Sequence, residues 1–218
     1  SSVRRCFSVV GCVTVAVLLS AGPAAAEGGS AGGNVSYTVY NNLVQVDNNR
    51  PAVQSVSTAS AVSLDSGNAA VQNANLAYSH SFNCTGCRTV TVAIQAVVVQ
   101  GNPTVLQPQN AAVAVNDSCT SCQTYAYAHQ YLFLPYHPVQ IDGETRDRLA
   151  GIQSAINWVA NSGKDFATIN GQLDQLSWAF CDTVQRAVQS QQEGEGSSTT
   201  TNVCGAAPFD HRQVQEHN

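Results

Sequence analysis

The sequence is poor in charge and contains a single lysine. Only 11% of its 218 residues are Asp, Glu, Lys or Arg, and Lys164 is the one lysine among nine basic side chains. Proteins that bind nucleic acids neutralise phosphates with clustered Lys and Arg side chains, and the sequence has no such cluster. The composition therefore argues against a nucleic-acid partner. Its abundance of small and uncharged polar residues is typical of exported β proteins.

Signature motifs of the common enzyme classes are also missing. The chain has no Gly-x-Ser-x-Gly, no phosphate-binding loop, no dinucleotide fingerprint and no His-Glu-x-x-His. We interpret His80 and His129, which fall on predicted strands, as surface or packed side chains rather than metal ligands. The sequence thus identifies no catalytic residue. We expect neither enzymatic activity nor a cofactor, apart from the zinc alternative considered below.

The only long apolar run lies at the N-terminus and has the layout of a signal peptide. Arg4 and Arg5 precede the apolar stretch 7–19, and the small residues 24–26 form a cleavage site. A bilayer span needs about 20 apolar residues, so we predict that residues 1–26 are removed and that the mature chain has no span. Seven basic against fourteen acidic residues then give a net charge of about −7. The predicted location is secreted or envelope-associated.

Two CxxC motifs lie in an internal repeat with an offset of 35 residues. Residues 84–95 read CTGCRTVTVAIQ and residues 119–130 read CTSCQTYAYAHQ, with six of twelve positions identical. A related Asn-Ala-x-x-Ala strand precedes each copy, beginning at Asn73 and at Asn110. Each CxxC is flanked by alternating β sequence. We therefore predict two pseudo-symmetric, antiparallel β-hairpins with a CxxC at each turn.

The period of two separates a repeated strand face from a variable one. Thr89 and Gln95 recur as Thr124 and Gln130, which indicates a structural role, because a side chain needed for chemistry is usually needed once. The variable face of the second copy is aromatic, and its rings are a candidate surface for binding an envelope protein or a polysaccharide. That candidate surface comprises Tyr125, Tyr127, Tyr131, Phe133 and Tyr136. The alternative is that these rings form a core layer under helices.

The apolar period becomes helical after Pro138. It predicts two antiparallel helices, with Asp142 as the first N-cap and a second helix that begins near Asp165. The predicted fold class is α+β: mainly antiparallel β, followed by an antiparallel two-helix hairpin. The segments are a signal peptide (1–26), a leader with strands (27–67), the duplicated CxxC region (68–139), the helical hairpin (140–188) and a disordered tail (189–218).

Six cysteines remain in the mature chain, and an even number in an exported protein favours disulfides. The candidates are Cys84, Cys87, Cys119, Cys122, Cys181 and Cys204. A disulfide could close each CxxC or link the two copies. Alternatively, the four CxxC thiolates could hold one zinc ion, as in a zinc ribbon. Thiol–disulfide exchange is a third interpretation, although a redox CxxC usually opens a helix and these motifs precede strands.

The tandem CTxCxTxxxAxQ repeats, the linker Val-Val-Val-Gln-Gly-Asn-Pro and the helical hairpin resemble a family of exported actinobacterial proteins. Related segments form the C-terminal part of membrane proteins labelled peptide zinc metalloproteases. The resemblance covers about residues 68–188 and implies the architecture, not the protease activity, since this chain has no His-Glu-x-x-His and no multispanning region. The expected function is an exported, non-enzymatic structural or binding module. A zinc-binding accessory domain of an envelope peptidase system is the first alternative and a thiol–disulfide exchange protein the second.

Overall fold

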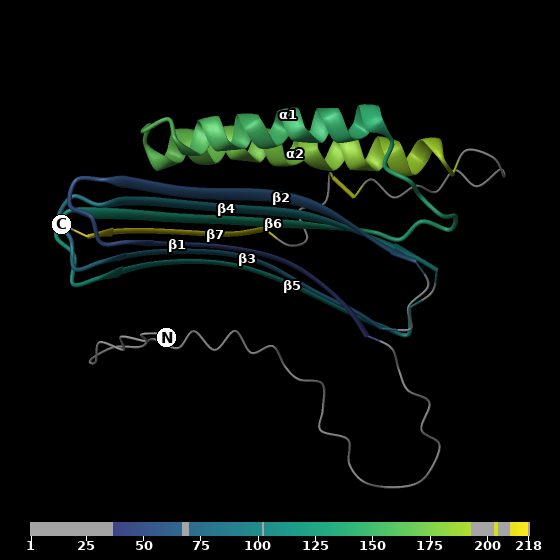
Figure 1. The fold of residues 1–218 in the computed structure, drawn as a ribbon, viewed down its shortest axis with the longest axis horizontal. Helices are drawn as coiled ribbons and strands as arrows, with labels where there is room; N and C mark the ends of the chain where they lie inside the picture. Colours follow the sequence, from purple (N-terminus) through teal and green to yellow (C-terminus); the bar gives the residue numbers. More distant parts are fainter. Residues whose placement is uncertain (1–36, 67–69, 102, 193–202, 205–209, 218) are drawn as a thin grey trace, which may run out of the picture. The chain divides into compact units, whose positions relative to one another are not determined.

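A computed structural model describes residues 37–66, 70–101, 103–192, 203–204 and 210–217. The predicted signal peptide and most of the predicted leader lie outside the described residues. The elements, in chain order, are β1 (Tyr37–Asn48), β2 (Gln54–Ser66), β3 (Ala70–Phe82), β4 (Arg88–Gln100), β5 (Val105–Asp117), β6 (Cys122–Phe133), α1 (Gly143–Ala160), α2 (Phe166–Ser190) and β7 (Asp210–His217). Figure 1 shows them in three layers: a sheet of β1, β3 and β5, a second sheet of β2, β4, β6 and β7, and the two helices.

The first six strands pair with one another only in parallel, so the predicted antiparallel hairpins are wrong. The chain passes from one sheet through a turn into the other, and β1–β2, β3–β4 and β5–β6 form three stacked coils. Each strand pairs with its equivalent in the next coil, as in a β-solenoid. A period of two is the same in parallel and antiparallel strands, and for this reason the pattern could not distinguish the two arrangements.

The stack contains three coils, although the sequence repeat reveals only two. The register is continuous: Gln54 pairs with Arg88, and Arg88 pairs with Gln123. In the first coil, residues 50–53 (Arg-Pro-Ala-Val) take the place of a CxxC, which hides the repeat. The register also corrects one alignment, because Asn75, and not Asn73, is the partner of Asn110.

Hydrogen-bonding side chains lie between the two sheets, among small apolar ones. Asn42 donates to Asn75 across 2.9 Å, and Asn75 donates to Asn110 across 2.7 Å, which forms a ladder through all three coils. The same amides reach the opposite sheet, since Asn42 donates to the carbonyl oxygen of Ile94 and Asn75 to that of Ala93. Buried amides need such partners, and the ladder therefore holds the coils in register and the sheets together.

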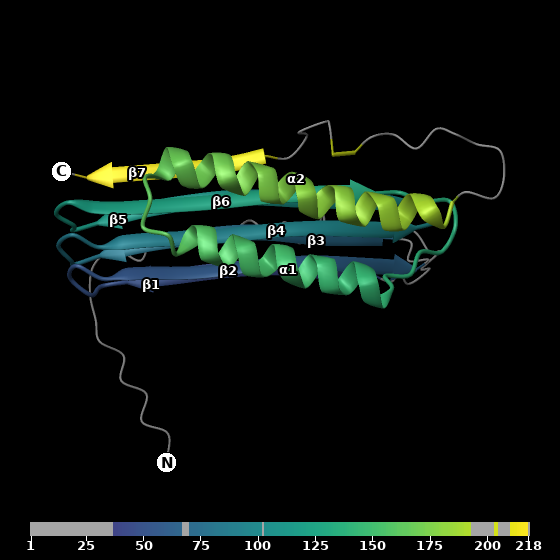
Figure 2. The same cartoon turned by 90° about the horizontal axis from the view of Figure 1, so that it is seen from above.

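The helical hairpin covers the outer face of the second sheet (Figure 2). Asp142 and Asp165 are the N-caps of α1 and α2, and they accept hydrogen bonds from the backbone N–H groups of Thr145 and Thr168. The apolar residues whose period predicts the two helices lie in the core. Ile156, Phe166, Ile169 and Leu173 are buried, and Leu149, Ile152 and Leu176 pack against them half-buried. Neither described helix is long and apolar enough to cross a membrane.

The C-terminal segment contains a strand where the sequence predicts a disordered tail. β7 pairs antiparallel with β6, from Cys122 opposite His217 to His129 opposite Asp210. The polar residues of this segment give no strand pattern, but β6 offers a row of unpaired backbone groups on its outer edge. Pairing with a second strand satisfies those groups, which are otherwise a template for aggregation.

Candidate functional site

The two CxxC motifs form adjacent turns at one end of the coil stack. Backbone hydrogen bonds join them: Thr120 N–H donates to Cys84 O across 3.0 Å, and Gly86 N–H donates to Thr120 O across 2.9 Å. The backbone conformations also match, since φ is 66° at Gly86 and 53° at the equivalent Ser121. The two motifs are thus equivalent turns of successive coils, and the predicted pseudo-symmetric hairpins are wrong.

The four sulfur atoms of these turns lie in one cluster. Cys84 and Cys87 form a disulfide, while Cys119 and Cys122 are free thiols. Cys84 Sγ lies 3.4 Å from Cys119 Sγ and 3.4 Å from Cys122 Sγ. The Sγ atoms of Cys84, Cys119 and Cys122 all lie within 4.8 Å of one another. The arrangement therefore brings together all four cysteines that the sequence proposes as alternative zinc ligands.

The environment of the cluster keeps the Cys119 thiol protonated at neutral pH. Cys84, Cys87 and Cys122 are buried, and Cys119 is partly exposed. Burial and a hydrogen bond with Cys122 raise the pKa of the Cys119 thiol to about 11. Because the thiolate is the attacking species in disulfide exchange, this shift disfavours a redox enzyme. A bound cation would reverse the preference, since metal coordination deprotonates a thiol.

Four of the five aromatic residues of the candidate binding surface are core residues. Tyr125, Tyr127, Tyr131 and Phe133 are at most 3% exposed and lie under α2, and only Tyr136 is on the surface, with 84% exposed. Their hydroxyl groups bond α2 in order along the strand: Tyr125 with Asn170, Tyr127 with Asp174 and Tyr131 with Ser177. The prediction of a binding surface is therefore wrong for these four residues, which form a core layer under the helices, as the alternative interpretation has it.

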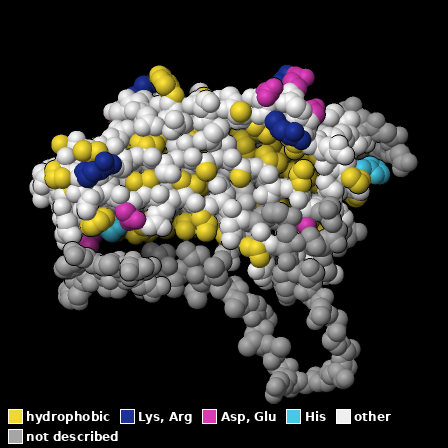
Figure 3. Space-filling model, viewed as in Figure 1, with side chains coloured by type: hydrophobic (Ala, Val, Ile, Leu, Met, Phe, Trp, Pro, Cys, Tyr) yellow, Lys and Arg dark blue, Asp and Glu magenta, His cyan; other side chains and the backbone are white. Residues whose placement is uncertain are grey.

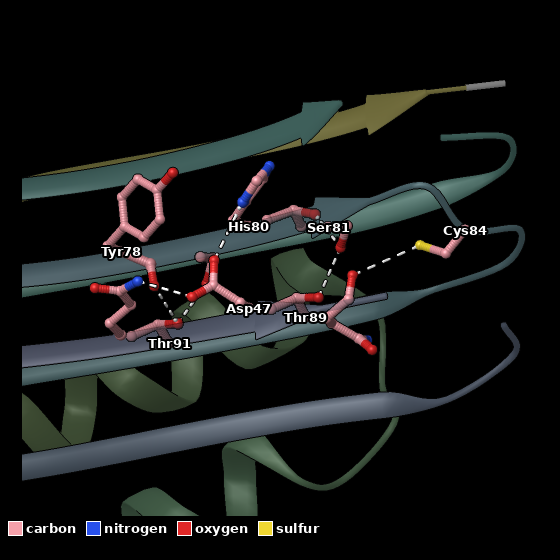
Figure 4. A network of polar contacts seen from close by, with 11 residues as sticks. Asp47, Tyr78, His80, Ser81, Cys84, Thr89 and Thr91 are labelled. Atoms are coloured by element: carbon pink, nitrogen blue, oxygen red, sulfur yellow. Dashed lines mark hydrogen bonds and ion pairs between the residues drawn. The ribbon is translucent and has the colours of Figure 1, made fainter. Parts of the chain in front are cut away.

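His80 is the one histidine with a described carboxylate partner. Its Nδ1 lies 3.1 Å from Asp47 on the outer face of the first sheet (Figure 4). An Asp–His pair suggests a catalytic triad, but the nearest serines, Ser79 and Ser81, are fully buried on the opposite face of β3. They bond Thr91 and Thr89 between the sheets. Neither serine is therefore placed to act as a nucleophile with this pair.

His129 is packed and is not placed as a metal ligand. It is 7% exposed, its ring stacks on Tyr131 with centroids 4.9 Å apart, and its Nδ1 lies 3.0 Å from the Tyr127 hydroxyl. This position agrees with the interpretation of His129 as a packed side chain.

A second disulfide connects α2 to the tail. Cys181 is fully buried on α2 and bonds Cys204, whose backbone N–H and that of Val203 face Gln185 Oε1. Both residues are among the disulfide candidates from the sequence, and their bond links residue 204 to α2. It is distant in sequence from the CxxC motifs and joins a different part of the fold.

Comparison of the chain with models of protein families, with curated proteins and with solved structures finds no match. The argument for function therefore rests on the residues themselves. Among the described residues, the four-cysteine cluster is the one place where side chains that bind metals or undergo redox chemistry converge.

Proposed function

We propose that the protein is an exported, non-enzymatic structural module in which the cysteines stabilise the coil stack. One observation carries the proposal: the side chains that recur from coil to coil are buried or half-buried and contact their equivalents in the next coil. Asn75 donates a hydrogen bond to Asn110, Gln130 donates one to Gln95, and the CxxC cysteines pack against one another. Residues repeated for folding in this way are not available to act on a substrate. Export rests on the signal-peptide pattern of the N-terminal sequence.

In the exported protein, each CxxC is closed by its own disulfide. Cys84 and Cys87 already have this bond, and the turn that contains Cys119 and Cys122 has the same backbone conformation. Asn83 and Ser118, which precede the two motifs, have φ values of 50° and 52°. The geometry that closes the first pair is therefore repeated at the second, and an oxidising compartment favours the bond.

Zinc binding is the second candidate, and the proximity of the sulfur atoms favours it. A tetrahedral site with Zn–S bonds of about 2.3 Å places its sulfurs about 3.8 Å apart. The 3.4 Å separations of Cys84 from Cys119 and Cys122 are close to that value. In this case Cys84, Cys87, Cys119 and Cys122 would be the four ligands of a buried structural site, with no open position for catalysis.

Stability measurements on cysteine pairs distinguish the two candidates. The variants are Cys84→Ser with Cys87→Ser, Cys119→Ser with Cys122→Ser, and all four together, each compared by urea unfolding with the parent protein. Independent disulfides predict that the two losses of unfolding free energy add, because the pairs do not share a partner. A shared zinc ion predicts that either double substitution removes the whole site, so that the second adds almost nothing.

Thiol and metal content give the same decision by an independent route. For protein purified from the exported fraction without chelator, we expect no free thiol after denaturation and no stoichiometric metal. One equivalent of zinc together with four titratable thiols would reject the disulfide assignment in favour of the metal site. Reduction of a test disulfide by the reduced protein, lost in the Cys119→Ser variant, would instead reject the non-enzymatic proposal.

A further inference from the structure

An apolar groove of about 500 Å³ lies between β2 and the helical hairpin. Its walls include Val62 and Leu64 of β2 and Leu149 of α1, and Phe180 of α2 and Ile141 also contribute. Figure 3 shows hydrophobic side chains gathered in a hollow below the first half of α1, beside a basic side chain. The volume falls in the range of about 300–1,000 Å³ that is usual for small-molecule sites.

The groove exists because the side chains under the helices are smaller in the first coil than in the third. At one position of the sheet, His129 is followed by Ile94 and then by Ser60, and at the next, Tyr131 is followed by Ala96 and Val62. The bulky coil fills the space under α2. The first coil, with its smaller side chains, leaves space under α1.

Hydrogen bonds hold α1 above β2 and keep this space from closing. Gln153 of α1 donates to Thr58 Oγ1 across 2.9 Å, and Gln54 of β2 donates to Ala160 O across 3.3 Å. Helix and strand are thus fixed at two points along their length. A preformed groove of this kind binds a ligand without the cost of a large rearrangement.

The groove has one charged lining residue, and that residue is a cation. Among the nine lining residues, Arg146 carries the charge, while the polar members Ser60 and Gln153 are neutral and no acidic side chain is present. Arg148, two residues further along α1, is instead paired with Glu144 across 2.8 Å. An apolar groove with a single cation at its exposed rim complements a molecule that has an apolar body and one anionic end.

We propose that this groove binds a fatty acid. The alkyl chain lies against Val62, Leu64, Leu149 and Phe180, and the carboxylate pairs with Arg146. The proposal does not depend on the state of the cysteines, none of which lines the groove. A failure here would therefore leave the disulfide assignment untouched, and a zinc ion at the CxxC turns would leave the groove unchanged.

Calorimetric titration of the intact protein with dodecanoate and with 1-dodecanol tests the proposal. We expect saturable binding of dodecanoate, with a dissociation constant that rises about tenfold in Arg146→Gln, as for loss of a charge-assisted hydrogen bond. Arg148→Gln is the matched control, because it removes the same charge from the same helix outside the groove, and it should change the affinity less than twofold. The alcohol lacks the carboxylate, so its binding should be equal in the parent and in Arg146→Gln.

A second variant tests the position of the chain. Ala150 is exposed on α1 and lines the groove, so Ala150→Trp should fill the space while the helix is retained. We expect dodecanoate binding to fall at least tenfold with an unchanged circular dichroism spectrum. Absence of saturable binding to the parent would overturn the proposal. Equal affinities in Arg146→Gln and Arg148→Gln, or unaltered binding in Ala150→Trp, would do so as well.

Discussion

The side-chain amide of Gln130 donates a hydrogen bond to Gln95 Oε1 across 2.9 Å, although the two residues are 35 positions apart. Both are at most 1% exposed and occupy the same position in successive coils. The bond therefore reports directly on the register of the stack. Its removal should affect stability in a way that depends on both partners.

We predict energetic coupling between these two glutamines. Gln130→Leu removes the donor and leaves a buried amide of Gln95 beside an apolar group, which should cost about 1–3 kcal/mol of unfolding free energy. The double variant Gln95→Leu with Gln130→Leu removes both halves of the pair. It should cost less than the sum of the single variants by about 0.5–3 kcal/mol, measured by urea unfolding.

Gln123→Leu is the control for this cycle, since Gln123 is an exposed glutamine on the same strand. Its effect should remain within about 0.5 kcal/mol. Strict additivity of the Gln95 and Gln130 substitutions would contradict a stabilising hydrogen bond between these two side chains.

Periodicity was enough to identify the faces of the strands and the helical hairpin. Thr89 and Gln95 face the interior between the sheets, and Ile156 and Leu173 lie in the core under the helices. It could not give the direction of pairing, because alternation is the same in parallel and antiparallel strands. The sequence repeat does not reveal the first coil, because Arg50 and Val53 occupy the positions of the two cysteines. The structure of this coil therefore depends on stacking against the next coil and not on a local sequence motif.

The cysteine cluster was predictable in its members but not in its geometry. Spacing alone brings Cys84 near Cys87 and Cys119 near Cys122. The approach of Cys84 to Cys119 follows from the stacking of coils, a long-range contact that a sequence pattern does not encode. The aromatic row of β6 is a related case. Clustered tyrosines suit a binding surface and a core equally well, and only the position of α2 decides between them.

A left-handed backbone position recurs in the three turns between β1 and β2, β3 and β4, and β5 and β6. It predicts that adding a side chain there lowers stability and that removing one raises it. Ala52, Gly86 and Ser121 are equivalent and have φ values of 56°, 66° and 53°. A Cβ atom at Gly86 would meet no close neighbour, so Gly86→Ala acts through the backbone. It should cost about 1–2 kcal/mol. Ser121→Gly should relieve the same strain, and we expect this gain to exceed the added chain entropy of glycine, so that the melting temperature rises.

Gly171→Ala is the matched control in a helix. Gly171 is exposed on α2, and an added Cβ atom would have no neighbour within 4 Å. Alanine favours a helix over glycine by about 1 kcal/mol. The same chemical change should therefore stabilise the protein at position 171 and destabilise it at position 86. Thermal unfolding of both variants checks the signs, and stabilisation by Gly86→Ala would contradict the left-handed turn.

The disulfide between Cys181 and Cys204 should contribute more stability than that between Cys84 and Cys87. The paired residues are 23 positions apart in the first case and 3 in the second. Loop-closure entropy gives about 3.4 kcal/mol for the longer loop and about 1.9 kcal/mol for the shorter. We expect Cys181→Ala with Cys204→Ala to lower the urea midpoint more than Cys84→Ser with Cys87→Ser. The variant Cys181→Ala with Cys204→Ala should also reduce hydrogen-exchange protection in β7, which follows Cys204. Undiminished protection of residues 210–217 would show that pairing with β6 holds β7 in place without the disulfide.

The N-cap of α2 predicts how stability changes in acid. Hydrogen bonds from the side chain and backbone of Thr168 lower the pKa of Asp165 below its ordinary value of 3.8. Between the two pKa values the unfolded chain binds a proton that the folded protein does not, so stability falls as the pH decreases. The stabilisation should be complete above about pH 5 and should disappear as the pH falls through the folded-state pKa.

Asp165→Asn retains a good capping residue without a charge. The difference in melting temperature between the parent and this variant should therefore be constant from about pH 5 to 8 and shrink below about pH 4. In Thr168→Val the hydroxyl donor is absent while the backbone N–H remains, so the acid-dependent part should become smaller and the cap should persist. A difference that stays constant down to pH 2 would contradict the lowered pKa.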